Sequence, residues 1–193
     1  MKHVFFIRHG RTEGNQAHRY IGRTDETLSE PGIKMLKKGL LAGIYPVPDR
    51  LFVSPMKRCL ETANLLYPQI TGTVIEDLRE LDFGIFENKN AEELADCPDY
   101  QNWVDSGGLL PIPGGESREC FLARSVKGFQ EAISQAGDAE QIGFVVHGGT
   151  IMSLLSSLSV PESSYYDWIV KNGDVIYCNY EEDRLHVLEW LHA

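Results

Sequence analysis

The chain has 193 residues, with 28 acidic side chains against 18 lysines and arginines, and its formal net charge at neutral pH is −10. This length suits one domain, over residues 1–193, that buries a sizeable core. A negative charge of this size offers no attraction to a nucleic-acid backbone or an anionic membrane, so the composition argues against both as partners.

The first predicted element is a short buried strand over residues 4–7, and Arg8, His9 and Gly10 follow it without a gap. In an open α/β sheet, ligands bind at the carboxyl ends of the strands. The guanidinium of Arg8 and the imidazole of His9 are therefore expected to project together into a ligand site.

A helix is predicted over residues 29–43. Ser29 is a suitable N-cap and Gly43 is a suitable stop. Ile33, Leu36 and Leu40 have the spacing of one apolar helix face. The helix is therefore expected to be amphipathic.

A second apolar run, at residues 51–53, predicts another strand, and Pro55 opens the helix that follows it. Arg58 and Thr62 share a face of that helix. Arg58 is thus expected at the same edge of the sheet as Arg8. A further short strand is predicted over residues 73–75, before the loop that carries Glu80.

The least regular region covers residues 82–117, which are rich in glycine and proline. At most two short helices are expected there, at about residues 91–96 and 99–106. A long insertion beside a site on the sheet edge is typical of a lid, so this segment is predicted to be one.

The remaining elements complete an α/β fold. Ser117 is expected to cap a helix to about residue 136, residues 142–146 predict a strand before His147, and residues 150–158 predict a helix. Residues 174–180 and 185–190 predict a hairpin around a turn at 181–183. Strands that alternate with helices predict a doubly wound, mostly parallel sheet with helices on both faces.

Five segments together resemble branch 1 of the histidine phosphatase superfamily, the phosphoglycerate mutase-like group. Their order and spacing span nearly the whole chain, and the resemblance implies that fold and a phosphatase or mutase chemistry. The segments are RHGRTEGN at 8–15, SPMKRCLETA at 54–63, LRELDFGIFENK at 78–89, PGGES at 113–117 and VVHGGT at 145–150. Within the superfamily, the segments at 22–32 and 165–180 and the short middle region with Tyr100 and Trp103 look most like the alpha-ribazole phosphatases, small enzymes of cobalamin assembly.

A phosphate monoester dianion needs partners that stay cationic, and the planar fork of arginine can grip two phosphate oxygens at once. Arg8 and Arg58 are therefore assigned as phosphate clamps. His9 is the candidate nucleophile, because nearby guanidiniums lower the pKa of an imidazole and favour its neutral, phosphoryl-accepting form. The resemblance makes His147 a donor to the phosphoryl oxygens, and the amides from Gly148 onward could add donors.

The leaving alkoxide must gain a proton, and a water must later lose one. The resemblance puts Glu80 in both roles, with Asp82, two residues on, as the alternative. Asn15 and Gly22 correspond to positions that shape the phosphate pocket of the family.

The sequence departs from the family pattern at three places. Arg11 stands where many members carry an acid, Ile21 where mutases often have a hydroxyl, and Phe86-Glu87-Asn88 where Trp-Glu-Gly is usual. These departures leave the details of the substrate open. The core set of catalytic residues is nevertheless complete, and it consists of Arg8, His9, Arg58, Glu80 and His147.

The segment 82–117 carries eight acids against one base, Lys89. Such a lid should repel bisphosphoglycerate, so the sequence favours a phosphatase for a small monophosphate with a neutral or weakly charged remainder, such as alpha-ribazole 5'-phosphate. A phosphoglycerate mutase or a sugar (fructose-bisphosphate) phosphatase is the enzymatic alternative. An inert module that binds a phosphorylated ligand is the non-enzymatic one.

Neither the other histidines nor the four cysteines show a metal-ligand spacing, so we expect no metal and no cofactor, and reduced cysteines. Only four apolar residues precede Arg8 in a run, too few for a signal-peptide core, and no run approaches transmembrane length. We therefore expect a cytoplasmic enzyme whose partner is a small-molecule phosphomonoester, with a homodimer left open as its assembly.

Overall fold

A six-stranded sheet with the strand order β3-β2-β4-β1-β5-β6 forms the centre of the computed structural model, which describes all 193 residues. Apolar runs form the buried parts of β1, β2, β4 and β5, as expected where a sheet is buried on both faces. The strands are β1 (Lys2–Arg8), β2 (Arg50–Val53), β3 (Thr73–Val74), β4 (Gln141–Val146), β5 (Val175–Glu181) and β6 (Arg184–Leu191).

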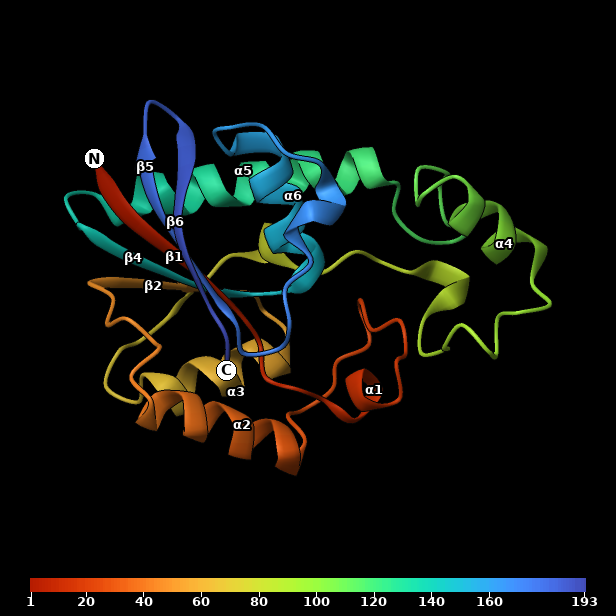
Figure 1. Ribbon diagram of the computed structural model, residues 1–193, viewed down its shortest axis with the longest axis horizontal. Coiled ribbons are helices and arrows are strands. Elements are labelled where there is room, and N and C mark those ends of the chain that lie inside the picture. The colour runs from red at the N-terminus through yellow and green to blue at the C-terminus, as the bar shows by residue number, and fades with distance from the viewer.

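The sheet is mixed, with four parallel strands and an antiparallel hairpin. β1 pairs in parallel with β4, β4 with β2, and β2 with β3, whereas β5 runs antiparallel to β1 and β6 antiparallel to β5 (Figure 1). Glu182 and Asp183 both adopt positive φ in the turn of the hairpin. The predicted mostly parallel sheet and the closing hairpin are confirmed.

Helices cover both faces of the sheet. Val4 and Phe6 of β1 point into one core, beneath α5 (Arg118–Ala136) and α6 (Gly148–Leu158). Phe5 and Ile7 point into the other, against α2 (Glu30–Leu41) and α3 (Lys57–Leu66) (Figure 1). These four side chains are fully buried, so the middle of β1 is apolar and its polar residues, among them Arg8, lie only at its two ends.

The caps of α2 are as predicted, but its buried face is not. Ser29 accepts a hydrogen bond from a backbone N–H of the first turn, and Leu36 is fully buried. Leu40, however, is 42% exposed, and Gly39 faces the core instead. A side chain at Gly39 would come within 2.9 Å of Tyr45. The ring of Tyr45 therefore packs against the helix at Gly39, where the predicted apolar face would have buried Leu40.

The segment 82–117 folds into a small unit at the edge of the sheet. It holds a 3₁₀ turn at Gly84–Phe86 and α4 (Pro98–Asp105), close to the helix predicted there. The helix predicted over residues 91–96 is wrong, because those residues form turns. Pro98 has no N–H with which to extend a helix and starts a new one instead. Phe86, Leu94 and Tyr100 pack in a core of their own.

No helix has both the length and the apolar character needed to cross a membrane. The four cysteines are free, with Cys59 and Cys178 buried. The domain boundaries and the motion of a lid stay predictions.

Candidate active site

The carboxyl ends of β1, β2 and β4 bring the predicted polar residues together. Arg8 is the last residue of β1 and lies opposite Val146 of β4, so His9 and His147 follow neighbouring strands. Their rings meet edge to face with centroids 5.2 Å apart. Arg58 reaches them from the first turn of α3, which follows β2.

His9 is held as a neutral imidazole with one free nitrogen. Its ring is buried, and Nδ1 lies 2.7 Å from the Gly10 carbonyl oxygen. A carbonyl only accepts hydrogen bonds, so Nδ1 carries the proton and Nε2 keeps its lone pair. Burial, then Arg58 and Arg8, hold the pKa of His9 well below its usual value. The side chain is therefore suited to attack phosphorus through Nε2.

Arg8 has donors to spare in the site. Its Nη1 donates to the Val170 carbonyl at 2.6 Å, while its buried Nε has no partner. A buried N–H group without an acceptor costs free energy of folding. Such an unpaired donor is expected in a site whose ligand is an anion. A side chain on Gly148 would lie 3.3 Å from the guanidinium, so glycine lets Arg8 rest against the start of α6.

Arg58 is fully buried and held by backbone oxygens. It donates to the carbonyls of Thr24 at 2.8 Å and Gly22 at 2.9 Å, and its Nε donates to Nδ1 of His147 at 3.3 Å. A side chain on Gly22 would come within 1.9 Å of the Leu81 carbonyl oxygen. Only glycine fits there, and the predicted site position Gly22 serves by holding the clamp.

His147 is placed by Arg58 on one side and by Ser54 on the other. Because Nδ1 accepts from Arg58, the ring proton is on Nε2 and is donated to Ser54 Oγ at 2.6 Å. To donate to a phosphoryl oxygen through Nδ1, the ring must change tautomer, with the Ser54 hydroxyl then donating to Nε2. Ser54 can play both parts because a hydroxyl donates and accepts. Sequence reasoning missed it, although it directly follows a predicted strand.

We expect Ser54→Ala to lower kcat about tenfold, because His147 loses the hydrogen bond that sets its proton position. Ser125→Ala is the matched control, since Ser125 is a buried serine whose hydroxyl has no partner. Steady-state rates of the two variants decide the point. An equal effect of both would show that Ser54 only fills space.

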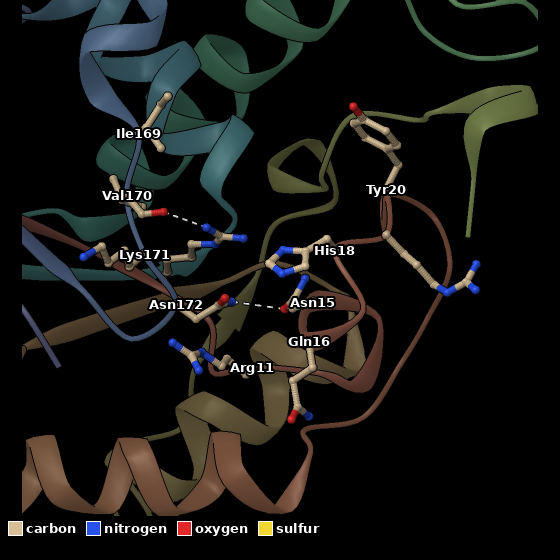
Figure 2. Close-up of a pocket in the computed structure, with 11 residues that line it drawn as sticks. Arg11, Asn15, Gln16, His18, Tyr20, Ile169, Val170, Lys171 and Asn172 are labelled. Atoms are coloured by element: carbon tan, nitrogen blue, oxygen red, sulfur yellow. Dashed lines mark hydrogen bonds between the residues drawn. The ribbon is translucent and has the colours of Figure 1, made fainter. Parts of the chain in front are cut away.

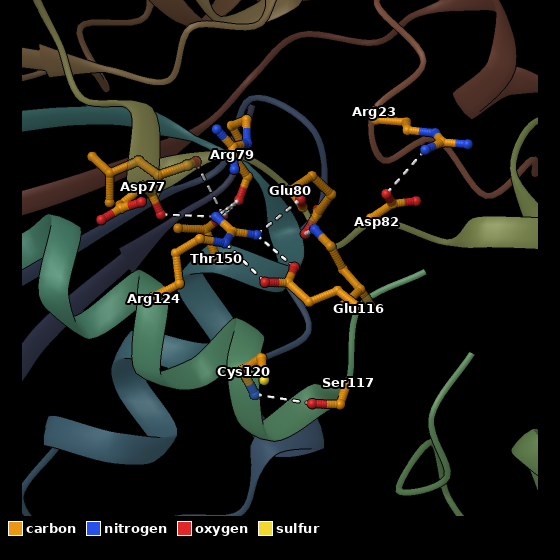
Figure 3. A network of polar contacts seen from close by, with 12 residues as sticks. Arg23, Asp77, Arg79, Glu80, Asp82, Glu116, Ser117, Cys120, Arg124 and Thr150 are labelled. Atoms are coloured by element: carbon orange, nitrogen blue, oxygen red, sulfur yellow. Dashed lines mark hydrogen bonds and ion pairs between the residues drawn. The ribbon is translucent and has the colours of Figure 1, made fainter. Parts of the chain in front are cut away.

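Glu80 is the carboxylate that faces the site. It accepts the N–H of Leu81 at 2.9 Å and of Gly149 at 3.0 Å, and a side chain on Gly149 would come within 2.3 Å of it. Burial, the largest effect, raises the pKa of Glu80 above its usual value. Asp82 is tied instead to the Gly84 N–H and to Arg23 (Figure 3). The geometry favours Glu80 as the proton donor.

Arg124 of α5 fixes the loop that carries Glu80 (Figure 3). Its guanidinium donates to the carbonyl oxygens of Asp77, Arg79 and Glu80 at 2.9 to 3.3 Å and pairs with Glu116 at 2.7 Å. Both partners of this ion pair are largely buried. Arg124 therefore joins the end of the insertion to the catalytic loop, a function that its place inside a helical pattern did not reveal.

Asn15 lies on α1 (Glu13–Gln16), a short helix that was not predicted. The amide of Asn172 donates to the His9 carbonyl and to Oδ1 of Asn15, both at 3.1 Å (Figure 2). Asn172 thus couples the loop after β1 to the chain just before β5. It was not predicted, because its partner lies more than 150 residues away.

A cavity of about 680 Å³ opens beside this cluster, with Arg8 and Asn15 in its wall (Figure 2). None of the eight acids of segment 82–117 lines it. Glu87 accepts N–H groups of residues 22–24, Glu93 pairs with Arg19, and Glu116 pairs with Arg124. In this structure those carboxylates therefore hold the fold or face solvent and do not lie in the wall of the cavity, while the closing of segment 82–117 as a lid stays a prediction.

The structure accounts for two of the three departures from the family pattern. Asn88 has φ +57°, in the left-handed region where asparagine replaces glycine at low cost. Ile21 is buried against Gly14 and offers its carbonyl, not its side chain, to Arg58. Arg11 lines the cavity, without an ion pair.

The chain is similar to known proteins over nearly its whole length. Residues 4–192 match the family model described as histidine phosphatase superfamily (branch 1). An adenosylcobalamin/alpha-ribazole phosphatase of Salmonella typhimurium is 26% identical over 175 residues, covering 88% of this chain and 86% of the relative. A candidate phosphoserine phosphatase of Hydrogenobacter thermophilus is 29% identical over 164 residues, covering 82% and 79%.

One solved structure with the same fold is the alpha-ribazole phosphatase of Shigella flexneri, with a TM-score of 0.85. It is 24% identical, and the match covers 99% of this chain and 96% of that one. The predicted doubly wound fold is thereby confirmed on a second ground.

Proposed function

Because the chain belongs to branch 1 of the histidine phosphatase superfamily, we propose that this phosphatase hydrolyses a small phosphomonoester through a phosphohistidine on His9. The observation that carries the proposal is the buried, neutral imidazole of His9, which has a free Nε2 and a pKa lowered by burial and by two guanidiniums. These guanidiniums belong to Arg8 and Arg58, and the ring of His147 meets that of His9. Glu80, whose pKa is raised by burial, is close enough to both guanidiniums for them to oppose that rise.

In the first step the phosphoryl oxygens take the unpaired donors of Arg8 and the remaining N–H of Arg58. Nε2 of His9 attacks phosphorus as the bond from phosphorus to the ester oxygen breaks. Glu80, whose pKa is raised by burial, acts in its protonated form and gives its proton to the leaving alkoxide. The free alcohol departs and the phosphoryl group stays on His9.

In the second step Glu80, now a carboxylate, takes a proton from water as that water attacks phosphorus. The bond from phosphorus to Nε2 breaks, inorganic phosphate leaves, and His9 returns to its neutral form with Nδ1–H on the Gly10 carbonyl. Every group ends in its starting protonation state, so the cycle needs no other reactant than water.

Alpha-ribazole 5'-phosphate is the candidate substrate that the Salmonella relative's name supplies, and phosphoserine is the one from Hydrogenobacter. A phosphoglycerate mutase remains the alternative reaction. A steady-state screen over alpha-ribazole 5'-phosphate, phosphoserine, sugar phosphates and p-nitrophenyl phosphate tests the proposal. Release of phosphate from several esters supports it, whereas transfer between glycerate positions without net release contradicts it.

We expect activity to survive EDTA at millimolar concentration, because the two guanidiniums supply the positive charge that a metal would otherwise bring and an imidazole supplies the nucleophile. No group of three or more histidine, cysteine, aspartate or glutamate side chains is arranged to hold a metal ion. The measurement compares kcat/KM before and after chelation. Loss of activity that added divalent metal restores would overturn the assignment of the site.

A further inference from the structure

The cavity beside the phosphate site carries two cationic side chains that nothing in the protein neutralises. Arg11 and Lys171 both line it, are exposed, and form no ion pair or side-chain hydrogen bond. A third cation of the wall, Arg19, differs because Glu93 takes its guanidinium in a two-pronged pair. Arg8 belongs to the phosphate site itself. The free positive charge of the cavity therefore comes from Arg11 and Lys171.

The backbones of these two residues are fixed although their charged ends are free. The Arg11 carbonyl accepts both the N–H and the hydroxyl of Ser29 at the start of α2. The Lys171 N–H donates to the buried carboxylate of Asp174 at 3.1 Å. Two cations on fixed supports make a preorganised place for an anion, because little backbone freedom is lost when it binds.

The adjoining contacts tie this place to the reacting group. Val170, the residue before Lys171, offers its carbonyl to Arg8, and Asn172, the residue after it, holds the His9 carbonyl. In Figure 2 the charged ends of Arg11 and Lys171 extend to the same side of Asn172. Lys171 thus lies between two residues that hold groups of the phosphate site, and Arg11 lies two residues after His9.

We propose that Arg11 and Lys171 form a second anion subsite, which binds a carboxylate or second phosphate on the alcohol part of the substrate. The inference rests on the proposed phosphatase function and narrows its substrate class. It explains why an arginine follows Gly10, where the family pattern has an acid. It also reverses the preference for a neutral remainder that was expected from the acids of segment 82–117, none of which lines the cavity.

Two pairs of substrates that differ chiefly in a carboxylate test the subsite. They are phosphoserine against phosphoethanolamine, and 3-phosphoglycerate against glycerol 3-phosphate. We expect kcat/KM about tenfold or more higher for the carboxylate member of each pair, the size of effect typical of charge-assisted hydrogen bonds. 2,3-Bisphosphoglycerate is the separate arm for a second phosphate. A ratio of one in both pairs, with no gain for the bisphosphate, overturns the proposal.

Variants locate the effect. Arg11→Gln and Lys171→Gln should each lower the ratio within a pair about tenfold. Lys37→Gln, which makes the same charge change on the exposed face of α2, should leave the ratio unchanged. If Arg11→Gln and Lys171→Gln leave the ratio as it is, the anion binds elsewhere and the proposal is wrong.

Calorimetric binding of phosphoserine and phosphoethanolamine to the His9→Ala protein separates this question from turnover. Tighter binding of phosphoserine that Arg11→Gln abolishes supports the subsite even if no ester is hydrolysed. Equal binding overturns it even if the enzyme is an active phosphatase. The two proposals can therefore fail independently.

Discussion

Replacing His9 with alanine should lower kcat for any ester about a thousandfold or more, because the change removes the atom that becomes phosphorylated. The other groups of the site only stabilise charge or move protons, so each of them should leave more activity behind. The measurement is the initial rate of phosphate release at saturating substrate. His186→Ala, a histidine on β6 outside the site, is the control and should retain full activity.

The structure identifies Nε2 of His9 as the atom that attacks phosphorus. Nδ1 is occupied by the Gly10 carbonyl, so only Nε2 can attack. Substantial turnover by His9→Ala would mean that water attacks the ester directly, and the phosphohistidine route would have to be abandoned. A folded protein with an unchanged circular dichroism spectrum is needed for the comparison, since the residue is buried.

The second large effect is expected for Glu80→Gln, and it should depend on the leaving group. An alkoxide cannot leave without a proton, whereas a nitrophenolate can. Glutamine keeps the size of the side chain but has no proton to give. We expect kcat for an alkyl ester such as ribose 5-phosphate to fall about a hundredfold or more, and for p-nitrophenyl phosphate far less.

The dependence on pH gives a further sign of the same group. Glu80 must be protonated to act as the acid, so kcat/KM for the alkyl ester should fall as pH rises through its raised pKa. This limb should be absent in Glu80→Gln. The pKa of His9 is held well below its usual value. Protonation of this nucleophile should therefore reduce the rate only at a pH well below the range in which an ordinary histidine titrates.

Asp82→Asn is the matched control, because Asp82 is bound to Gly84 and Arg23 instead of facing the site. It should show no dependence on the leaving group. If Asp82→Asn shows the dependence on the leaving group and Glu80→Gln does not, Asp82 is the acid and the assignment of Glu80 from the family motif is wrong. Equal slowing of both substrates by Glu80→Gln would instead limit that residue to positioning water or phosphate.

Features fixed by local sequence were predictable. The apolar runs of β1 and β4 are followed directly by Arg8 and His147, and parallel pairing then brings these residues to one edge. The caps Ser29 and Ser117 mark their helices because a hydroxyl satisfies free N–H groups at a helix start. These signals predicted where Arg8, His9 and His147 lie, whereas the assignment of Glu80 rested on the resemblance to the histidine phosphatases.

Features that depend on distant partners were not predictable. Arg124, a surface-like arginine in its own helix, binds carbonyls more than 40 residues away. Asn172 acts across the whole chain on His9. Counting acids in segment 82–117 did not reveal where they point for the same reason, since composition does not say that Glu87 and Glu116 point to structural partners.

The central claim is the phosphohistidine, and isolating it is the most direct test. The active protein should be mixed with a phosphate ester, quenched in alkali within milliseconds, and digested for mass spectrometry, because the phosphorus-nitrogen bond is labile to acid. A phosphoryl group on His9, present in the wild-type protein and absent from His9→Ala, is the expected result. A phosphoryl group on another residue, or its absence in a protein that turns over without delay under the same quench, would contradict the mechanism.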